Sequence, residues 1–280
     1  MLAKLLKYEW RAVSKLMLPF TIAVLGVSLL GTMMLRLNLY LGTLYERSAV
    51  LNIFSSLTTV FTVLVVLAII GYGIATIILL LQRYYKNFFS DEGYLTFTLP
   101  VKTSSLLWSK LIVALAWIAI SVVVATAGIM IIVLFGTAAN GLINQDAWIM
   151  LENLLHNLAQ ALQDAQAVIY FVEMLLMCLA SVVGTVIIFY LAITIGSIIA
   201  KKHKILVSVL MYYAINMAIS LALTALYAVM MTMLWSTGVG IGENAVIHIV
   251  FLGGVAIYAV AAVAGFLVNN RLLRRKLSLA

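Results

Sequence analysis

Six long windows of the sequence contain almost no charged side chain, and they limit the possible folds more than any other feature. A charged residue at the centre of a membrane-spanning helix costs about 2.5–3.5 kcal/mol on insertion scales, so such windows are typical of membrane spans. Each window reaches the roughly 20 residues with which a helix crosses about 30 Å of hydrocarbon. The predicted spans are residues 16–35, 57–81, 111–135, 168–200, 205–234 and 245–268. We therefore predict an all-α, polytopic membrane protein with a single transmembrane domain over residues 1–280.

The composition supports this class and excludes an ordinary soluble domain. Hydrophobic residues make up 65% of the chain and charged residues only 9%, far from the averages of soluble domains. The net charge of +8 does not indicate nucleic-acid binding, because the basic residues are divided among short segments beside the spans. These residues either interact with anionic headgroups of membrane lipids or only fix the topology.

The basic residues fall on one side of the predicted spans. Of the 17 Lys and Arg, only Arg36 and Arg47 lie on the opposite side. The others are Lys4, Lys7, Arg11, Lys15, Arg83, Lys86, Lys102, Lys110, Lys201, Lys202, Lys204, Arg271, Arg274, Arg275 and Lys276. Six acids lie opposite them or near that rim: Glu46, Asp146, Glu152, Asp164, Glu173 and Glu243. The positive-inside rule therefore places both termini in the cytoplasm.

Two amphipathic segments accompany the spans. Residues 1–15 place four basic side chains at helical spacing opposite an apolar face, which predicts either an N-terminal helix in the membrane interface or a plain continuation of the first span. Residues 140–167 carry a leucine stripe and are predicted to form an external amphipathic helix, capped near Asn144 or Asp146. Such a stripe either packs on the outer rim or the membrane, or acts as a substrate gate.

Motifs for catalysis are missing from the sequence. No G-x-x-x-x-G-K-[ST] loop for phosphate binding occurs, and the glycines at 238–242 are interpreted as a turn. The histidines lack metal-ligand spacing, and no acid pair indicates a hydrolase, so we expect neither an enzyme nor a metal or cofactor in this chain. Cys178 is expected to pack inside a span. Glu173 is expected at the outer rim, facing Arg36 or Arg47.

Small and polar residues recur inside the spans. Small residues at every fourth position, as in Ala192–Gly196–Ala200, Ala214–Ala218–Ala222 and Ala261–Gly265, predict close helix packing. Polar side chains in the spans are candidates for lining a conduit, although the same residue types also connect neighbouring helices. The candidate lining consists of Thr58, Thr59, Thr62, Asn216 and Ser220.

The segment over residues 83–108, between the second and third spans, is the strongest candidate for a functional site. It carries several aromatic residues beside an acidic pair, Asp91 and Glu92, and Pro100 precedes Thr103, which can cap the next helix. Exposed aromatic residues beside acids are suited to docking onto another protein. Alternatively, the aromatic rings lie in the headgroup belt and the acids lie in water.

At this segment the chain resembles a known family. The sequence DEGYLTFTLPVKTSSLLWSKL follows the second span, after a basic N-terminal segment, and the loop after the fourth span is short and basic. This layout is similar to the permease subunits of type 2 ATP-binding cassette exporters, in particular the bacterial branch in which permease and ATPase are separate chains. The most specific portion is Gly93 to Lys110, where YLTFTLPV is followed by a small polar stretch and SKL.

The resemblance implies a half-transporter in a bacterial cell membrane. A second permease, identical or related, and cytoplasmic ATPases that bind ATP and magnesium would be the partners. The loop at 83–108 would supply a coupling helix that fits a groove on the ATPase. Carried onto this chain, the coupling residues would be Phe88, Phe89, Asp91, Glu92, Tyr94 and Phe97.

The sequence also leaves other classes of function open. A secondary transporter or channel would need no ATPase, but it would need an ionisable residue embedded in the membrane, which Glu173 only approaches. A membrane anchor that transports nothing is a further alternative. For an exporter, the expected substrate is an amphipathic or antimicrobial peptide or another hydrophobic compound, because the spans lack a polar binding site.

Overall fold

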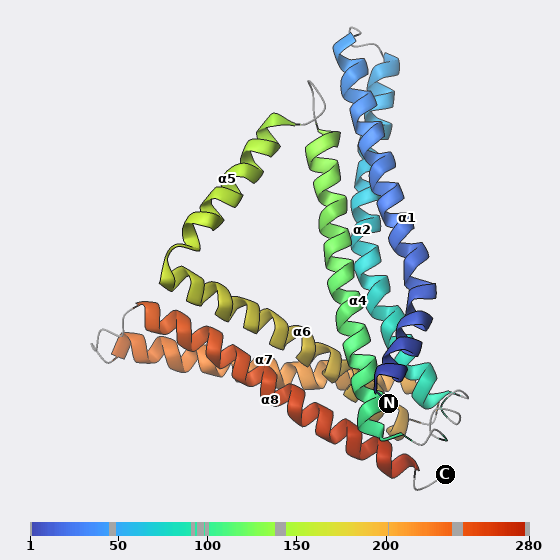
Figure 1. Ribbon diagram of the computed structural model, residues 1–280, viewed down its shortest axis with the longest axis vertical. Coiled ribbons are helices and arrows are strands. Elements are labelled where there is room, and N and C mark those ends of the chain that lie inside the picture. The colour runs from blue at the N-terminus through green and yellow to red at the C-terminus, as the bar shows by residue number, and fades with distance from the viewer. Residues whose placement is uncertain are drawn as a thin grey trace. The chain divides into compact units, whose positions relative to one another are not determined.

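The described part of the chain is built from helices. The computed structural model describes residues 2–44, 49–90, 93, 98, 101–137, 144–200, 202–236 and 243–277. All secondary structure in these residues is helical, as predicted. Six helices are long and apolar enough to cross a membrane, which indicates a multi-pass membrane protein. They are α1 (Leu2–Leu44), α2 (Ala49–Phe89), α4 (Thr103–Ile131), α6 (Ala165–Ile199), α7 (Lys204–Ser236) and α8 (Glu243–Leu277), shown in Figure 1.

The helices extend beyond the apolar windows from which they were predicted. Helix α1 is continuous from Leu2 to Leu44, so residues 2–15 form its first turns. These residues are mostly strong helix formers, and the first proline of the chain is Pro19, inside the helix. Val13 and Met17 are buried, whereas the four basic side chains are exposed. An amphipathic helix in the membrane interface stays a prediction.

The predicted external segment contains one helix, α5 (Gln145–Ala161). Its N-terminal cap is Asn144, whose side-chain oxygen accepts a hydrogen bond from the Ala147 amide at 3.2 Å. None of its residues is buried, and leucines such as Leu154 and Leu158 are exposed. Neither packing on the rim nor a gating role for this helix is therefore confirmed.

The chain divides into two compact units. The amino-terminal unit contains Lys7–Leu80 and Ala116–Gln160. The carboxy-terminal unit contains Met1–Leu6, Leu81–Leu115 and Ala161–Ala280. The segment on both sides of the candidate loop thus belongs with α6, α7 and α8, whereas most of α1, α2 and α4 forms the other unit. The single transmembrane domain stays a prediction.

In the amino-terminal unit, α1, α2 and α4 pack side by side around apolar side chains (Figure 1). The buried cluster contains Val24 from α1, Val65, Ile69 and Tyr72 from α2, and Ile132. Ile132 begins a π-helical turn, Ile132–Gly136, that follows α4. A hydrogen bond of 2.9 Å between the Thr21 and Tyr72 hydroxyl groups also connects α1 and α2.

In the carboxy-terminal unit, α6 packs against both α7 and α8 (Figure 1). Gly196 allows the contact with α7, because a Cβ atom at this position would lie 2.6 Å from the Ser208 backbone nitrogen. Gly265 similarly brings α8 close to Ile187 of α6. Close packing through small residues is confirmed at these two glycines. The stripe of Ala214, Ala218 and Ala222 is instead exposed on α7.

Candidate functional site

The candidate loop is attached to the fold at two ends, which we call its roots. The first root is the end of α2, residues 84–89, which is rich in aromatic residues. Phe88 is only 3% exposed, and the Lys110 Nζ lies 5.3 Å from the centre of its ring. Phe89 is half-buried, with its ring 6.4 Å from that of Tyr84 and 6.1 Å from that of Tyr85. The aromatic root is thus packed within the chain.

The other predicted coupling residues are Asp91, Glu92, Tyr94 and Phe97. They lie outside the described residues, so the coupling helix and its contact with an ATPase stay predictions. Gly93 is described, and its amide donates a hydrogen bond of 2.8 Å to the Ser90 carbonyl. A Cβ atom at Gly93 would lie 2.9 Å from the Phe88 carbonyl oxygen, so a larger residue would collide with the end of α2.

Three buried polar side chains meet beside this root. Tyr84 from α2, Thr194 from α6 and Asn269 from α8 are each at most 2% exposed. The Tyr84 and Thr194 hydroxyl groups are 2.9 Å apart, Thr194 donates to Asn269 Oδ1 at 2.7 Å, and Asn269 Nδ2 donates to Tyr84 Oη at 3.0 Å. The Tyr84 ring also stacks on that of Tyr190, with centres 4.0 Å apart.

Sequence reasoning missed this polar cluster. Its members come from three helices and are far apart along the chain, so no local spacing connects them. The available signal was weak: Asn269 is an amide at the end of an apolar window, and Tyr84 follows the last apolar residues of another.

The second root of the loop is the start of α4, residues 103–111. The helix begins at Thr103, whose hydroxyl oxygen accepts a hydrogen bond of 3.3 Å from Arg274 Nε of α8. Tyr190 of α6 donates from its hydroxyl group to the Lys110 carbonyl oxygen at 3.4 Å. Leu107 and Leu111 are almost fully buried. Both roots of the loop are therefore attached to α6 and α8.

A second buried polar cluster contains Glu173. This residue is 7% exposed, and its Oε1 lies 2.8 Å from Nδ1 of His248 in α8. The partner in the structure is thus His248, whereas the sequence suggested Arg36 or Arg47. The Tyr170 ring lies 4.8 Å from the His248 ring. Glu173 Oε2 and the Tyr170 hydroxyl oxygen are buried and have no hydrogen-bond partner among the described residues.

The predicted conduit residues are divided between the two units. On α2, the hydroxyl groups of Thr58, Thr59 and Thr62 each donate to a carbonyl oxygen four residues earlier in the same helix. On α7, the Asn216 side chain donates to the Tyr212 carbonyl oxygen, and Ser220 is exposed. Because these contacts are within single helices, a conduit lined by the five residues stays a prediction.

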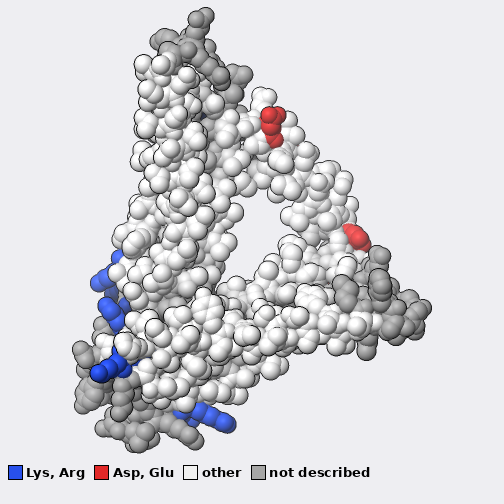
Figure 2. All heavy atoms as spheres, turned by 180° about the vertical axis from the view of Figure 1, so that it is seen from behind, with Lys and Arg blue, Asp and Glu red and all other residues white. Residues whose placement is uncertain are grey.

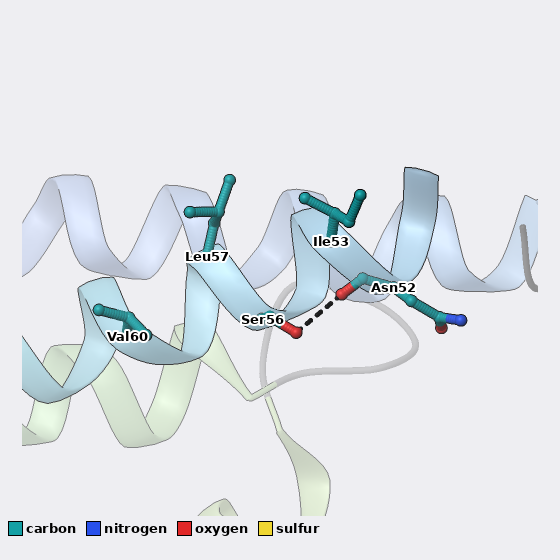
Figure 3. Close-up of a pocket in the computed structure, with 5 residues that line it drawn as sticks. All are labelled: Asn52, Ile53, Ser56, Leu57 and Val60. Carbon is teal, nitrogen blue, oxygen red and sulfur yellow. Dashed lines mark hydrogen bonds between the residues drawn. The ribbon is translucent and has the colours of Figure 1, made fainter. Parts of the chain in front are cut away.

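One shallow depression of about 320 Å³ lies along α2. Figure 3 shows its lining, in which the Ser56 hydroxyl group donates to the Asn52 carbonyl oxygen. The remaining lining residues are Ile53, Leu57 and Val60, and all five come from one helix. A shallow, apolar depression along a single helix cannot surround a ligand, so it does not indicate a binding site.

The surface provides two further observations. On the face drawn in Figure 2, Lys, Arg, Asp and Glu cover little of the surface. The predicted separation of basic and acidic residues across the membrane stays a prediction. Cys178 is exposed on α6, so the expected packing of this residue inside the described chain is wrong. Among the described residues, no three His, Cys, Asp or Glu side chains are grouped as metal ligands would be.

Comparisons with known proteins add no identification. No family model matches the chain, and neither a curated protein nor a solved structure matches it.

Proposed function

We propose that the chain is the permease subunit of a type 2 ATP-binding cassette exporter, which moves its substrate outward across a bacterial cell membrane. A separate cytoplasmic ATPase, which binds ATP and magnesium, supplies the energy. A second permease, identical or related, completes the transporter. Both termini and the loop between α2 and α4 face the cytoplasm.

The observation that carries this proposal is the anchoring of the loop between α2 and α4. A loop that receives force from a partner needs firm attachment to the helices that move. Here Phe88 is buried on one side, Thr103 is hydrogen-bonded to Arg274 on the other, and the segment Leu81–Leu115 belongs to the unit of α6, α7 and α8. The same loop carries the sequence that resembles the coupling segment of these permeases.

The substrate is proposed to be an amphipathic or antimicrobial peptide, or another hydrophobic compound. The described helices present large apolar surfaces and few polar groups, which suits such molecules better than sugars or ions. Only 6% of the most apolar stretch of α7 is buried within the chain, compared with 33% for α6, which leaves surface for lipid or a second permease.

The proposal is tested by purifying the full chain from its native membrane in mild detergent and assaying the sample for bound ATPase activity. We expect a bound ATPase. We further expect that the combined variant Phe89→Ala, Asp91→Ala and Glu92→Ala retains less than about a tenth of the bound ATPase activity. Removing a central aromatic and charged anchor of an interface costs about 2 kcal/mol or more of binding free energy.

The matched control is the variant Trp148→Ala, Asp146→Ala and Glu152→Ala on α5. It also removes one aromatic and two acidic side chains, but from the predicted external helix, so bound ATPase activity should stay at the level of the unmodified chain. Full ATPase binding by the loop variant would contradict the assignment of the coupling residues. A chain that never carries an ATPase would contradict the function itself.

Secondary transport is the second candidate, and the buried pair of Glu173 and His248 favours it. Ionisable residues inside membrane helices are often sites of proton coupling. Vesicles that contain only the purified chain, loaded with a pH-sensitive dye, distinguish the two functions under an imposed electrical potential. Proton uptake that the variant Glu173→Gln abolishes would support this candidate, whereas the ATPase-driven exporter should show no such uptake.

A further inference from the structure

The hydrogen bonds among Tyr84, Thr194 and Asn269 can form a closed ring. In one arrangement of the hydroxyl hydrogens, Tyr84 donates to Thr194, Thr194 donates to Asn269 Oδ1 and Asn269 Nδ2 donates back to Tyr84. The Tyr190 carbonyl oxygen, 2.9 Å from the Thr194 hydroxyl group, is a second acceptor for the same hydrogen. In the closed ring, each side chain is both donor and acceptor. Closed arrangements of this kind strengthen each bond in a low-dielectric interior, and opening one bond leaves buried polar atoms unpaired. These buried contacts therefore hold the three side chains beside one another.

The ring joins the end of α2 to the carboxy-terminal parts of α6 and α8. Thr194 lies on α6 and Asn269 on α8, and the Tyr84 ring additionally stacks on Tyr190 with planes only 5° apart. Apolar side chains would pack at these positions without the cost of burying polar groups. Buried polar pairs of this type can instead fix the register between elements, as a single asparagine does in coiled coils.

The second root of the loop is connected to the same two helices. Arg274 of α8 donates to Thr103, and Tyr190 of α6 donates to the Lys110 carbonyl oxygen. Lys110 in turn lies over the ring of Phe88, which joins the two roots to each other. Tyr190 therefore contacts both roots, through Tyr84 on one side and Lys110 on the other.

From these contacts we propose that the ring of Tyr84, Thr194 and Asn269 transmits movement of the two loop roots, residues 84–89 and 103–111, to α6 and α8. This inference rests on the proposed function, because it assumes that a partner moves the loop. The three residues are positioning residues: they bind neither ATP nor substrate. In this mechanism, a displacement of the loop changes the arrangement of α6 and α8 because both roots share their contacts with those helices.

The first test needs no partner. The variant Tyr84→Phe keeps the ring stack on Tyr190 but removes the hydroxyl group. We expect amides of the loop roots, residues 85–89 and 103–107, to exchange hydrogen about fivefold faster, because a buried hydrogen bond contributes about 1 kcal/mol. The control is Tyr212→Phe: this tyrosine stacks on Phe189 at 3.9 Å, and its hydroxyl group has no hydrogen bond within the described chain. Unchanged exchange in Tyr84→Phe would overturn the proposal.

The second test follows movement in the complex with the co-purified ATPase. Cys178 is the only cysteine and is exposed on α6, so a fluorescent maleimide on this residue reports on α6 directly. We expect the fluorescence change caused by ATP and magnesium to fall by at least half in Tyr84→Phe and Thr194→Val, while ATPase binding and hydrolysis persist. Thr194→Ser keeps the hydroxyl group and should restore the change, which a loss of packing alone would not predict.

The outcomes separate the two proposals. A full fluorescence change in Tyr84→Phe and Thr194→Val would overturn transmission through the ring while leaving the exporter intact. If no ATPase accompanies the chain, the proposed function fails and transmission fails with it. Hydrogen exchange would still decide whether the ring holds the loop roots. If Tyr84→Phe does not fold, as judged by gel filtration, Thr194→Val and Thr194→Ser decide both tests.

Discussion

Glu173 places a carboxyl group inside an apolar helix, where a single neighbour, His248, provides its hydrogen bond. His248 bonds to Oε1, whereas Oε2 is buried without a hydrogen-bond partner among the described residues. Removing the partner of a buried polar group leaves its desolvation free energy uncompensated, at about 1–3 kcal/mol. Replacing both partners by apolar groups is often much less harmful. We therefore expect mutations of Glu173 and His248 to have strongly non-additive effects on the free energy of unfolding.

We expect His248→Ala to lower the free energy of unfolding by about 1–3 kcal/mol, because it leaves the Glu173 carboxyl group buried and unpaired. Adding Glu173→Leu to this variant should recover most of the loss. The measurement is unfolding of the purified chain in detergent, with His203→Ala, at an exposed position, as the control. A double variant less stable than His248→Ala would show that the buried carboxyl group is not the cause.

At the scale of elements, the contact between α6 and α7 depends on backbone atoms that approach closely at Gly196. A methyl group there would lie 2.6 Å from the Ser208 nitrogen and 2.7 Å from its Cα. Backbone atoms cannot turn away as a flexible side chain can. The two helices would have to separate to accommodate it.

Gly196→Ala should therefore destabilise the chain by about 1–3 kcal/mol, the usual cost of overpacking. Ser208→Ala should not restore stability, because the obstacle is the backbone. Gly73→Ala is the matched control: no atom lies within 4 Å of the added methyl group, and alanine in a helix interior gains about 0.5–1 kcal/mol over glycine. Thermal unfolding in detergent compares the variants. Equal midpoints for Gly196→Ala and the unmodified chain would contradict this explanation.

The sequence predicted which elements exist better than it predicted their ends or their contacts. Charge-free windows locate the part of a helix that hydrocarbon surrounds, but α1 continues to Leu2 because charged residues such as Lys4 and Lys7 are also good helix formers. The cap at Asn144 was recognisable because capping is local. The ring at Tyr84 was not, because tertiary packing alone brings three distant side chains together.

At the scale of the whole molecule, six spans and the charge pattern predict that Lys202 and α5 lie on opposite sides of the membrane. In a Cys178→Ser background, a membrane-impermeant maleimide should label Glu152→Cys in intact cells, because this exposed position lies on the predicted outer side. A cysteine introduced by Lys202→Cys, also at an exposed position, should be labelled only after the cells are permeabilised. Equal labelling of both positions in intact cells would contradict the predicted topology.

The burial of Phe88 and Thr103 at the two roots limits how far the intervening segment can extend. At about 3.5 Å per residue, a chain that leaves at Ser90 and returns by Lys102 reaches no more than about 20 Å from its points of attachment. Any protein that binds this segment must therefore lie within about 20 Å of the ends of the helices. A contact that this loop makes is therefore confined to the neighbourhood of the helix ends.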